Sequence, residues 1–139
     1  MRDKVIPSVA AVALGLWVLA TPVIFVFFKA VPVAALNHLI VGIAVVALAM
    51  SRAVGRMGVG ASWAVAALGL WLVASPWLLG YSNAEAYANP GLLVANDVVV
   101  GGLLAALGAW AALLTRDVRQ GHGHVFAAAM PDEHERPHQ

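Results

Sequence analysis

The sequence repeats itself, and this repeat limits the fold more than any other feature. Segment 14–23 matches segment 68–77, which lies 54 residues later. Leu14, Gly15, Leu16, Trp17, Ala20 and Pro22 recur as Leu68, Gly69, Leu70, Trp71, Ala74 and Pro76. Thr21 recurs as another small hydroxyl, Ser75. Each copy is followed by a second matching segment, 37–42 and then 96–101, at an offset of 59 residues. The chain is therefore a tandem duplication of a two-segment unit.

The composition indicates a membrane protein. Of the 139 residues, 62% are apolar and 11% are charged, whereas soluble domains average about half and about a quarter. The apolar residues form four continuous runs, each close to the roughly 20 residues that span a bilayer as a helix. Barrel strands are excluded because they are short and alternate in polarity. We expect an all-α membrane protein with four transmembrane helices, arranged as two tandem parallel hairpins. The predicted helices cover residues 6–28, 32–50, 61–80 and 90–114.

These helices divide the chain into four parts. Residues 1–5 are a cytoplasmic N-terminus, 6–55 the first repeat, 56–115 the second repeat, and 116–139 a polar, histidine-rich cytoplasmic tail. The first apolar run is longer than the roughly 7–15 residues of a signal-peptide core, so it is interpreted as a membrane helix. Pro32 and Pro90 suit the first turns of their helices, where a proline sacrifices no hydrogen bond.

Positive charges give the orientation. Under the four-helix topology, seven of the eight basic residues fall on one side of the membrane, and Lys29 falls on the other. The seven are Arg2, Lys4, Arg52, Arg56, Arg116, Arg119 and Arg136. Because excess Lys and Arg marks the cytoplasmic side, both termini are expected there. The two repeats then share one orientation, related by a pseudo-twofold axis along the membrane normal.

The repeated motif resembles a known family. Ser75-Pro76-Trp77 in the second copy, and the altered Thr21-Pro22-Val23 in the first, are similar to the SPW repeat of small bacterial integral membrane proteins. The similarity covers most of residues 8–115. It implies a multi-pass protein of the bacterial plasma membrane and carries no activity to transfer.

Prolines within the helices leave backbone carbonyl groups that need another hydrogen-bond donor. Pro22 and Pro76 each remove a backbone hydrogen bond, and an unpaired carbonyl in hydrocarbon costs several kcal/mol. The adjacent hydroxyls of Thr21 and Ser75 can help locally. We expect the amides of Asn37 and Asn96, at similar depth, to bond to the kinked segment of their own repeat. The alternative is that each asparagine caps a shorter helix.

His38 and Asp97 are the chemically divergent positions of the repeat. They occupy equivalent places, and a pseudo-twofold axis can bring them face to face. Intramembrane ionisable residues are candidates for function, here proton relay or metal binding with a further ligand. The alternatives are that both reach water at the outer headgroups or that they form a structural ion pair.

Trp17 and Trp71 lie deeper than the interfacial Trp77, Tyr81 and Tyr87, and are interpreted as packing residues.

Small residues mark faces for close helix packing. Gly101, Ala105 and Gly108 line one face of the fourth helix, and Gly42 begins a weaker version on the second. The contact is either within the monomer or with another subunit.

The tail carries four histidines, which are weak candidates for a metal site because their spacing fits no defined one. They are His122, His124, His134 and His138. Pro131 and Pro137 favour a solvated, disordered tail.

The sequence lacks the residues and motifs that several classes of enzyme require. Without cysteine, thiolate and disulfide chemistry are excluded. No phosphate loop, nucleophile elbow or zinc-protease motif is present, and a net charge of +1 does not suggest nucleic-acid binding.

We expect no enzyme activity and no cofactor. The leading hypothesis is a structural or accessory subunit that contacts the lipid bilayer and other membrane subunits or itself. The alternative is a small permeation or proton- or ion-coupled unit using the His38/Asp97 region, and the third is a metal- or lipid/quinone-binding protein.

Overall fold

The fold was analysed in a computed structural model, which describes residues 2–25, 31–56, 58–83 and 89–128, with residues 2–5 and 115–128 described by their backbone alone. It contains four helices: α1 (Arg2–Ile24), α2 (Pro32–Ala53), α3 (Val59–Leu78) and α4 (Pro90–Ala128). The described chain is helical apart from its connections and ends.

All four helices are long and apolar enough to cross a membrane, which confirms the expected all-α class and span number for the described residues. The candidate spans are Ile6–Ile24, Pro32–Ala53, Val59–Leu78 and Pro90–Leu114. A helix rises about 1.5 Å per residue, so spans of 19 to 25 residues match a hydrocarbon core of about 30 Å.

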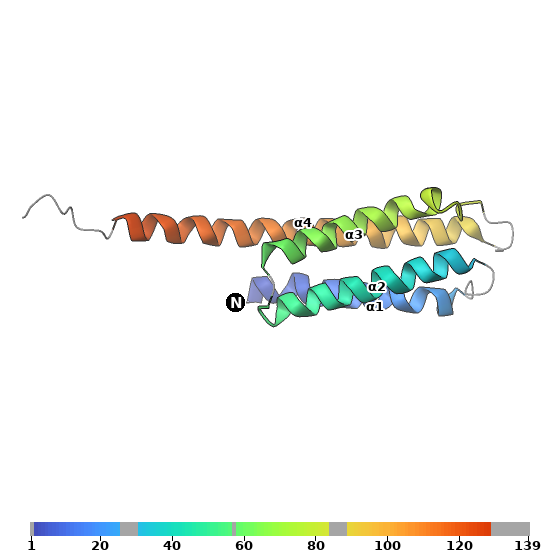
Figure 1. Ribbon diagram of the computed structural model, residues 1–139, viewed down its shortest axis with the longest axis horizontal. Helices are drawn as coiled ribbons and strands as arrows, with labels where there is room; N and C mark the ends of the chain where they lie inside the picture. Colours follow the sequence, from blue (N-terminus) through green and yellow to red (C-terminus); the bar gives the residue numbers. More distant parts are fainter. Residues whose placement is uncertain (1, 26–30, 57, 84–88, 129–139) are drawn as a thin grey trace, which may run out of the picture.

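The helices run up and down as two side-by-side hairpins (Figure 1). The N-terminus and the α2–α3 connection lie at one end of the bundle, and the α1–α2 and α3–α4 connections lie at the other. Packing is most extensive within the pairs α1/α2 and α3/α4, and weaker between α1 and α4 and between α2 and α3. The two hairpins are therefore the tightly packed units, and the contacts between them are sparser.

Glycines set the close approach within each hairpin. A Cβ atom on Gly101 of α4 would lie 2.6 Å from the carbonyl oxygen of Gly69 on α3. A Cβ atom on Gly42 of α2 would lie 3.0 Å from the carbonyl oxygen of Gly15 on α1. Gly108 lies equally close to α3, and the backbone of Ala105 lies against Gly69. The small-residue faces thus pack within this chain, where close backbone approach maximises van der Waals contact.

Helix starts and ends differ partly from the sequence expectation. α2 and α4 begin at Pro32 and Pro90, the residues at which the sequence places their starts. α1 ends at Ile24, before the expected residue 28, and α2 continues to Ala53. α4 continues through Ala128, well past residue 114, and projects beyond the bundle (Figure 1). No proline interrupts this stretch before Pro131, so the helix does not break where the membrane span ends.

Two adjacent glycines of α4 test the close packing. Gly101 faces α3, whereas a Cβ atom on Gly102 would meet no atom within 4 Å. We expect Gly101→Ala to destabilise the protein by about 1–3 kcal/mol, because the added methyl group overpacks the helix contact. The matched Gly102→Ala should be neutral or stabilising by up to about 1 kcal/mol through helix propensity. Unfolding free energies in mixed detergent micelles measure both. Equal effects of the two substitutions would contradict the packing role.

Candidate functional site

A fully buried pair of ionisable side chains joins the two hairpins, in the half of the bundle nearer the α1–α2 and α3–α4 connections. His38 on α2 and Asp97 on α4 are both 0% exposed. The Nε2 atom of His38 lies 2.7 Å from Oδ1 of Asp97. The two positions that the repeat makes equivalent are therefore in direct contact. An unpaired charge in this environment is expensive, and a pair of opposite charges reduces that cost.

The neighbours of the pair fix its protons. Nδ1 of His38 lies 2.7 Å from the carbonyl oxygen of Ala34, which only accepts, so Nδ1 carries a hydrogen. Tyr81 donates to Oδ2 of Asp97 at 2.8 Å, and the amide of Asn96 donates to Oδ1 at 3.3 Å. One hydrogen then lies between Nε2 of His38 and Oδ1 of Asp97, and the carboxyl group also accepts from Asn96 and Tyr81. Every contact of the pair is thus satisfied inside the protein.

Tyr81 reaches the pair because the chain reverses just after α3. Gly80 has φ of 75°, a left-handed conformation that favours glycine. The reversal directs Tyr81 back into the bundle, where it is 1% exposed. Its hydroxyl contacts Asp97 and lies 2.7 Å from Oγ of Ser75. The sequence predicted Tyr81 near the membrane boundary, and it lies just beyond the α3 span. The structure adds that its side chain is buried in the centre of the network.

The environment of Tyr81 resists ionisation. Tyr81 lies outside the membrane-spanning segments, and burial raises its pKa well above the usual value of 10.0. The negative charge of Asp97 raises this pKa further. A phenolate beside a carboxylate would combine desolvation with like-charge repulsion. The phenol therefore stays protonated and remains a hydrogen-bond donor.

Two tryptophan–asparagine hydrogen bonds connect the hairpins reciprocally. The indole Nε1 of Trp17 on α1 donates to Oδ1 of Asn96 on α4 at 3.0 Å. The indole Nε1 of Trp71 on α3 donates to Oδ1 of Asn37 on α2 at 2.9 Å. The two bonds join positions that the repeat makes equivalent. Trp17 and Trp71, interpreted above as packing residues, therefore have a polar role across the weaker helix contacts.

The asparagines bond to the opposite hairpin, so the expected contact with their own repeat is wrong. Asn37 also donates from Nδ2 to Oγ of Ser75 at 3.1 Å, again on the other hairpin. The reason is helical geometry. Asn37 precedes Gly42 by five residues, which is about 140° around the helix. Since Gly42 faces α1, Asn37 faces away from α1 and toward α3.

The motif hydroxyls satisfy backbone carbonyls locally. Ser75 lies 2.9 Å from the carbonyl oxygen of Leu72, which is the carbonyl that Pro76 leaves without its helical partner. Thr21 donates to the carbonyl oxygen of Trp17 at 2.8 Å. Ser75 has one hydroxyl hydrogen and two acceptors within reach, the oxygens of Leu72 and Tyr81. This hydroxyl can therefore close either contact, and it is the adjustable member of the network.

The remaining predicted residues lie elsewhere. Trp77 is exposed on α3, away from the network. His122 and His124 fall on the projecting part of α4, where the backbone alone is described, and His134 and His138 lie outside the described residues. Among the described residues no three His, Cys, Asp or Glu side chains gather in a metal-binding arrangement. The network is thus a closed hydrogen-bond system built from amide, imidazole, carboxylate, phenol and hydroxyl groups.

Comparison with known proteins gives one match. The family model of the SPW repeat domain matches residues 5–111, which include both copies of the motif and the whole of the polar network. This confirms the resemblance carried by the sequence motif. No curated protein and no solved structure matches the chain.

A double-mutant cycle tests the central pair. We expect His38→Ala and Asp97→Ala each to destabilise the protein by about 3 kcal/mol, because each leaves a buried polar partner without its hydrogen bond. The destabilisation of the double variant should be smaller than the sum of the two single effects by at least about 1 kcal/mol, because neither partner then remains unsatisfied. Val45→Ala, also fully buried on α2, is the control partner for Asp97→Ala and should be additive within about 0.5 kcal/mol. Additivity of His38→Ala with Asp97→Ala would show that the pair is not coupled.

Tyrosine titration tests the burial of Tyr81. The chain has two tyrosines, so Tyr87→Phe leaves Tyr81 as the sole phenol. In the folded variant we expect no phenolate ultraviolet absorbance through pH about 11, because the pKa of Tyr81 is raised. The same variant unfolded in denaturant should ionise near 10.0. A raised folded pKa stabilises the protein fully below the unfolded value, and this stabilisation is lost as pH rises toward the folded value. Ionisation near pH 10 in the folded state would contradict the network.

Proposed function

The chain belongs to the SPW repeat family of small membrane proteins, and on that premise we propose that it is a rigid accessory subunit with no catalysis of its own. It acts by binding other membrane subunits, or further copies of itself, within the bilayer. Two tandem hairpins, related by a pseudo-twofold axis along the membrane normal, form the scaffold. The partner contacts its outer helix faces.

The observation that carries this proposal is the separation between a satisfied interior and an apolar exterior. Both nitrogens of His38 and both oxygens of Asp97 have protein partners, which is how a fixed structural network is built. The outward faces of the helices carry large apolar side chains. Leu16, Ile43, Leu70 and Val99 are each more than half exposed, on α1, α2, α3 and α4 respectively. Such faces suit lipid or another membrane helix.

The proposed location is the bacterial plasma membrane with both termini in the cytoplasm. The α2–α3 connection lies at the end of the bundle that also holds the N-terminus (Figure 1), and Arg52 and Arg56 flank the end of α2 just before it. The basic residues 116 and 119 follow the last span. The excess of positive charge at this end supports the orientation. The projecting part of α4 would then reach into the cytoplasm, as a second surface for a partner.

A second candidate function is a proton-coupled unit. It is favoured by the continuous chain of exchangeable protons that runs from Asn37 through Ser75, Tyr81 and Asp97 to His38. Chains of this kind move protons in membrane proteins. It ranks second because these side chains are buried and bonded to one another, and a conducting path also requires access to water on both sides.

Site-specific crosslinking tests the subunit proposal. The natural chain is free of cysteine, so Leu16→Cys, Ile43→Cys, Leu70→Cys and Val99→Cys each introduce one thiol on a different helix. A membrane-permeant photoreactive maleimide is attached in the native membrane and then photolysed. We expect a covalent product from neighbouring positions on one side of the bundle, and a native mass after gentle extraction well above that of the 14.4 kDa chain.

The pattern across the four positions is the control. All four variants carry the label. A specific partner gives crosslinked products from labels on one face and none from labels on the opposite face, whereas random collision gives equal, weak products from all four positions. A monomeric native mass together with no specific product would overturn the subunit proposal. Proton uptake by His38 and Asp97 in the reconstituted protein would then become the function to measure.

A further inference from the structure

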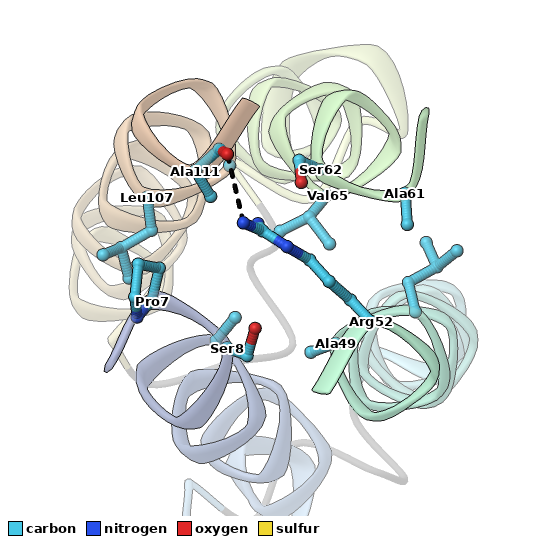
Figure 2. A pocket seen from close by; sticks show the side chains of 12 residues that line it. Pro7, Ser8, Ala49, Arg52, Ala61, Ser62, Val65, Leu107 and Ala111 are labelled. Carbon is cyan, nitrogen blue, oxygen red and sulfur yellow. Dashed lines mark hydrogen bonds between the residues drawn. The ribbon is translucent and has the colours of Figure 1, made fainter. Parts of the chain in front are cut away.

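A second polar site lies at the opposite end of the bundle from the His38–Asp97 pair. Twelve residues line a small cavity there, contributed by all four helices (Figure 2). All twelve fall into six pairs related by the repeat offsets of 54 and 59 residues. Ser8 pairs with Ser62, Ala49 with Gly108, and Arg52 with Ala111. The cavity is thus centred where the two hairpins meet.

Arg52 provides a positive charge at this cavity. It lies in the last turn of α2, and its Nη2 atom donates to the carbonyl oxygen of Ala111 on α4 at 3.0 Å. Figure 2 shows its side chain crossing the cavity with the guanidinium at the centre. Among the described residues, the one ion pair is His38–Asp97 at the other end. No described carboxylate therefore neutralises Arg52.

Two buried hydroxyls point into the same cavity. Ser8 on α1 is 2% exposed and Ser62 on α3 is 1% exposed. Neither Oγ atom has a hydrogen-bond partner in the protein. In Figure 2 the two oxygens lie on either side of the Arg52 guanidinium. Buried polar groups are nearly always satisfied, so a pair of unsatisfied hydroxyls at equivalent positions points to a ligand between them.

We propose that this cavity binds one small monovalent anion of the size of chloride, held by the Arg52 guanidinium and the Ser8 and Ser62 hydroxyls. All three groups can donate hydrogen bonds, and donors are what an anion requires. The volume open to the centre of a water-sized sphere is about 10 Å³, which is room for about one water molecule. An anion of similar size fits, and it neutralises the arginine inside the bundle.

Size and charge set this ligand apart from its competitors. A cation would meet the guanidinium with like charge. A lipid phosphate carries several oxygens and exceeds a water-sized cavity. A single water satisfies the hydroxyls but brings no negative charge to the guanidinium, which no described carboxylate neutralises. The proposal is independent of the subunit role, because the anion stabilises the contact between hairpins of one chain.

The test compares anions at equal ionic strength. The thermal midpoint of the purified full-length protein is measured in increasing sodium chloride, with sodium gluconate making up the balance. We expect a saturable rise with chloride, because a ligand that binds only the folded state stabilises it. Arg52→Gln should abolish this rise, and the Ser8→Ala/Ser62→Ala double variant should weaken chloride affinity about tenfold or more. Arg56→Gln, an exposed arginine just beyond α2, is the charge-matched control and should keep the full response.

Direct detection completes the test. Chloride-35 NMR line broadening by the protein should be present in the natural chain and in Arg56→Gln, and it should need about tenfold more protein or more in the serine double variant. This variant keeps Arg52, so it tests the site even if Arg52→Gln fails to fold. The proposal is overturned if chloride and gluconate give the same midpoints, if the serine double variant broadens the line equally, or if vesicles of phosphate-bearing lipid stabilise the protein while chloride does not.

Discussion

The structure depends on the absence of water from the hydrocarbon core. A polar group there must find its partner inside the protein, since an unsatisfied one costs several kcal/mol. This requirement explains why His38 and Asp97 lie in contact and why Tyr81, Ser75 and Asn37 join them. Each member completes the bonding of another. The network therefore selects one mutual position of the two hairpins, which apolar packing alone would leave weakly defined in lipid.

The contacts within each hairpin differ in kind from the contacts between the two hairpins. Within a hairpin, glycines let the backbones touch, and the contact is extensive and apolar. Between hairpins, the packing is sparser and polar bonds are concentrated there. The Trp17–Asn96 and Trp71–Asn37 bonds link the neighbouring helices, and His38–Asp97 links α2 and α4 directly. Close packing stabilises each half, and directional hydrogen bonds give the halves their register.

Much of this fold follows from the sequence, and the missing parts have physical reasons. The apolar runs and the repeat predict the four helices, and the equivalence of His38 and Asp97 allows them to meet. The burial of Tyr81 was not predicted, because it depends on the left-handed turn at Gly80, and composition does not reveal the direction of that turn. The partners of the asparagines were predicted on the wrong hairpin. The correct side follows once Gly42 is known to contact α1, because Asn37 lies about 140° around the helix from Gly42 and therefore faces α3. The cavity around Arg52 requires all four helices to converge, which no local pattern specifies.

At two places where the repeats differ chemically, the equivalent positions touch. Position 38 contacts position 97, and position 52 contacts position 111. At the first contact, the carboxyl group of Asp97 gives the imidazole of His38 a strong hydrogen-bond partner. At the second, two facing arginines would repel, because like charges interact strongly in a low dielectric, whereas Ala111 lets the Arg52 guanidinium face a carbonyl oxygen. Ser8 and Ser62 are identical, and both hydroxyls can donate to a shared ligand. Different side chains at the points of contact thus let two copies of one unit meet face to face with complementary chemistry.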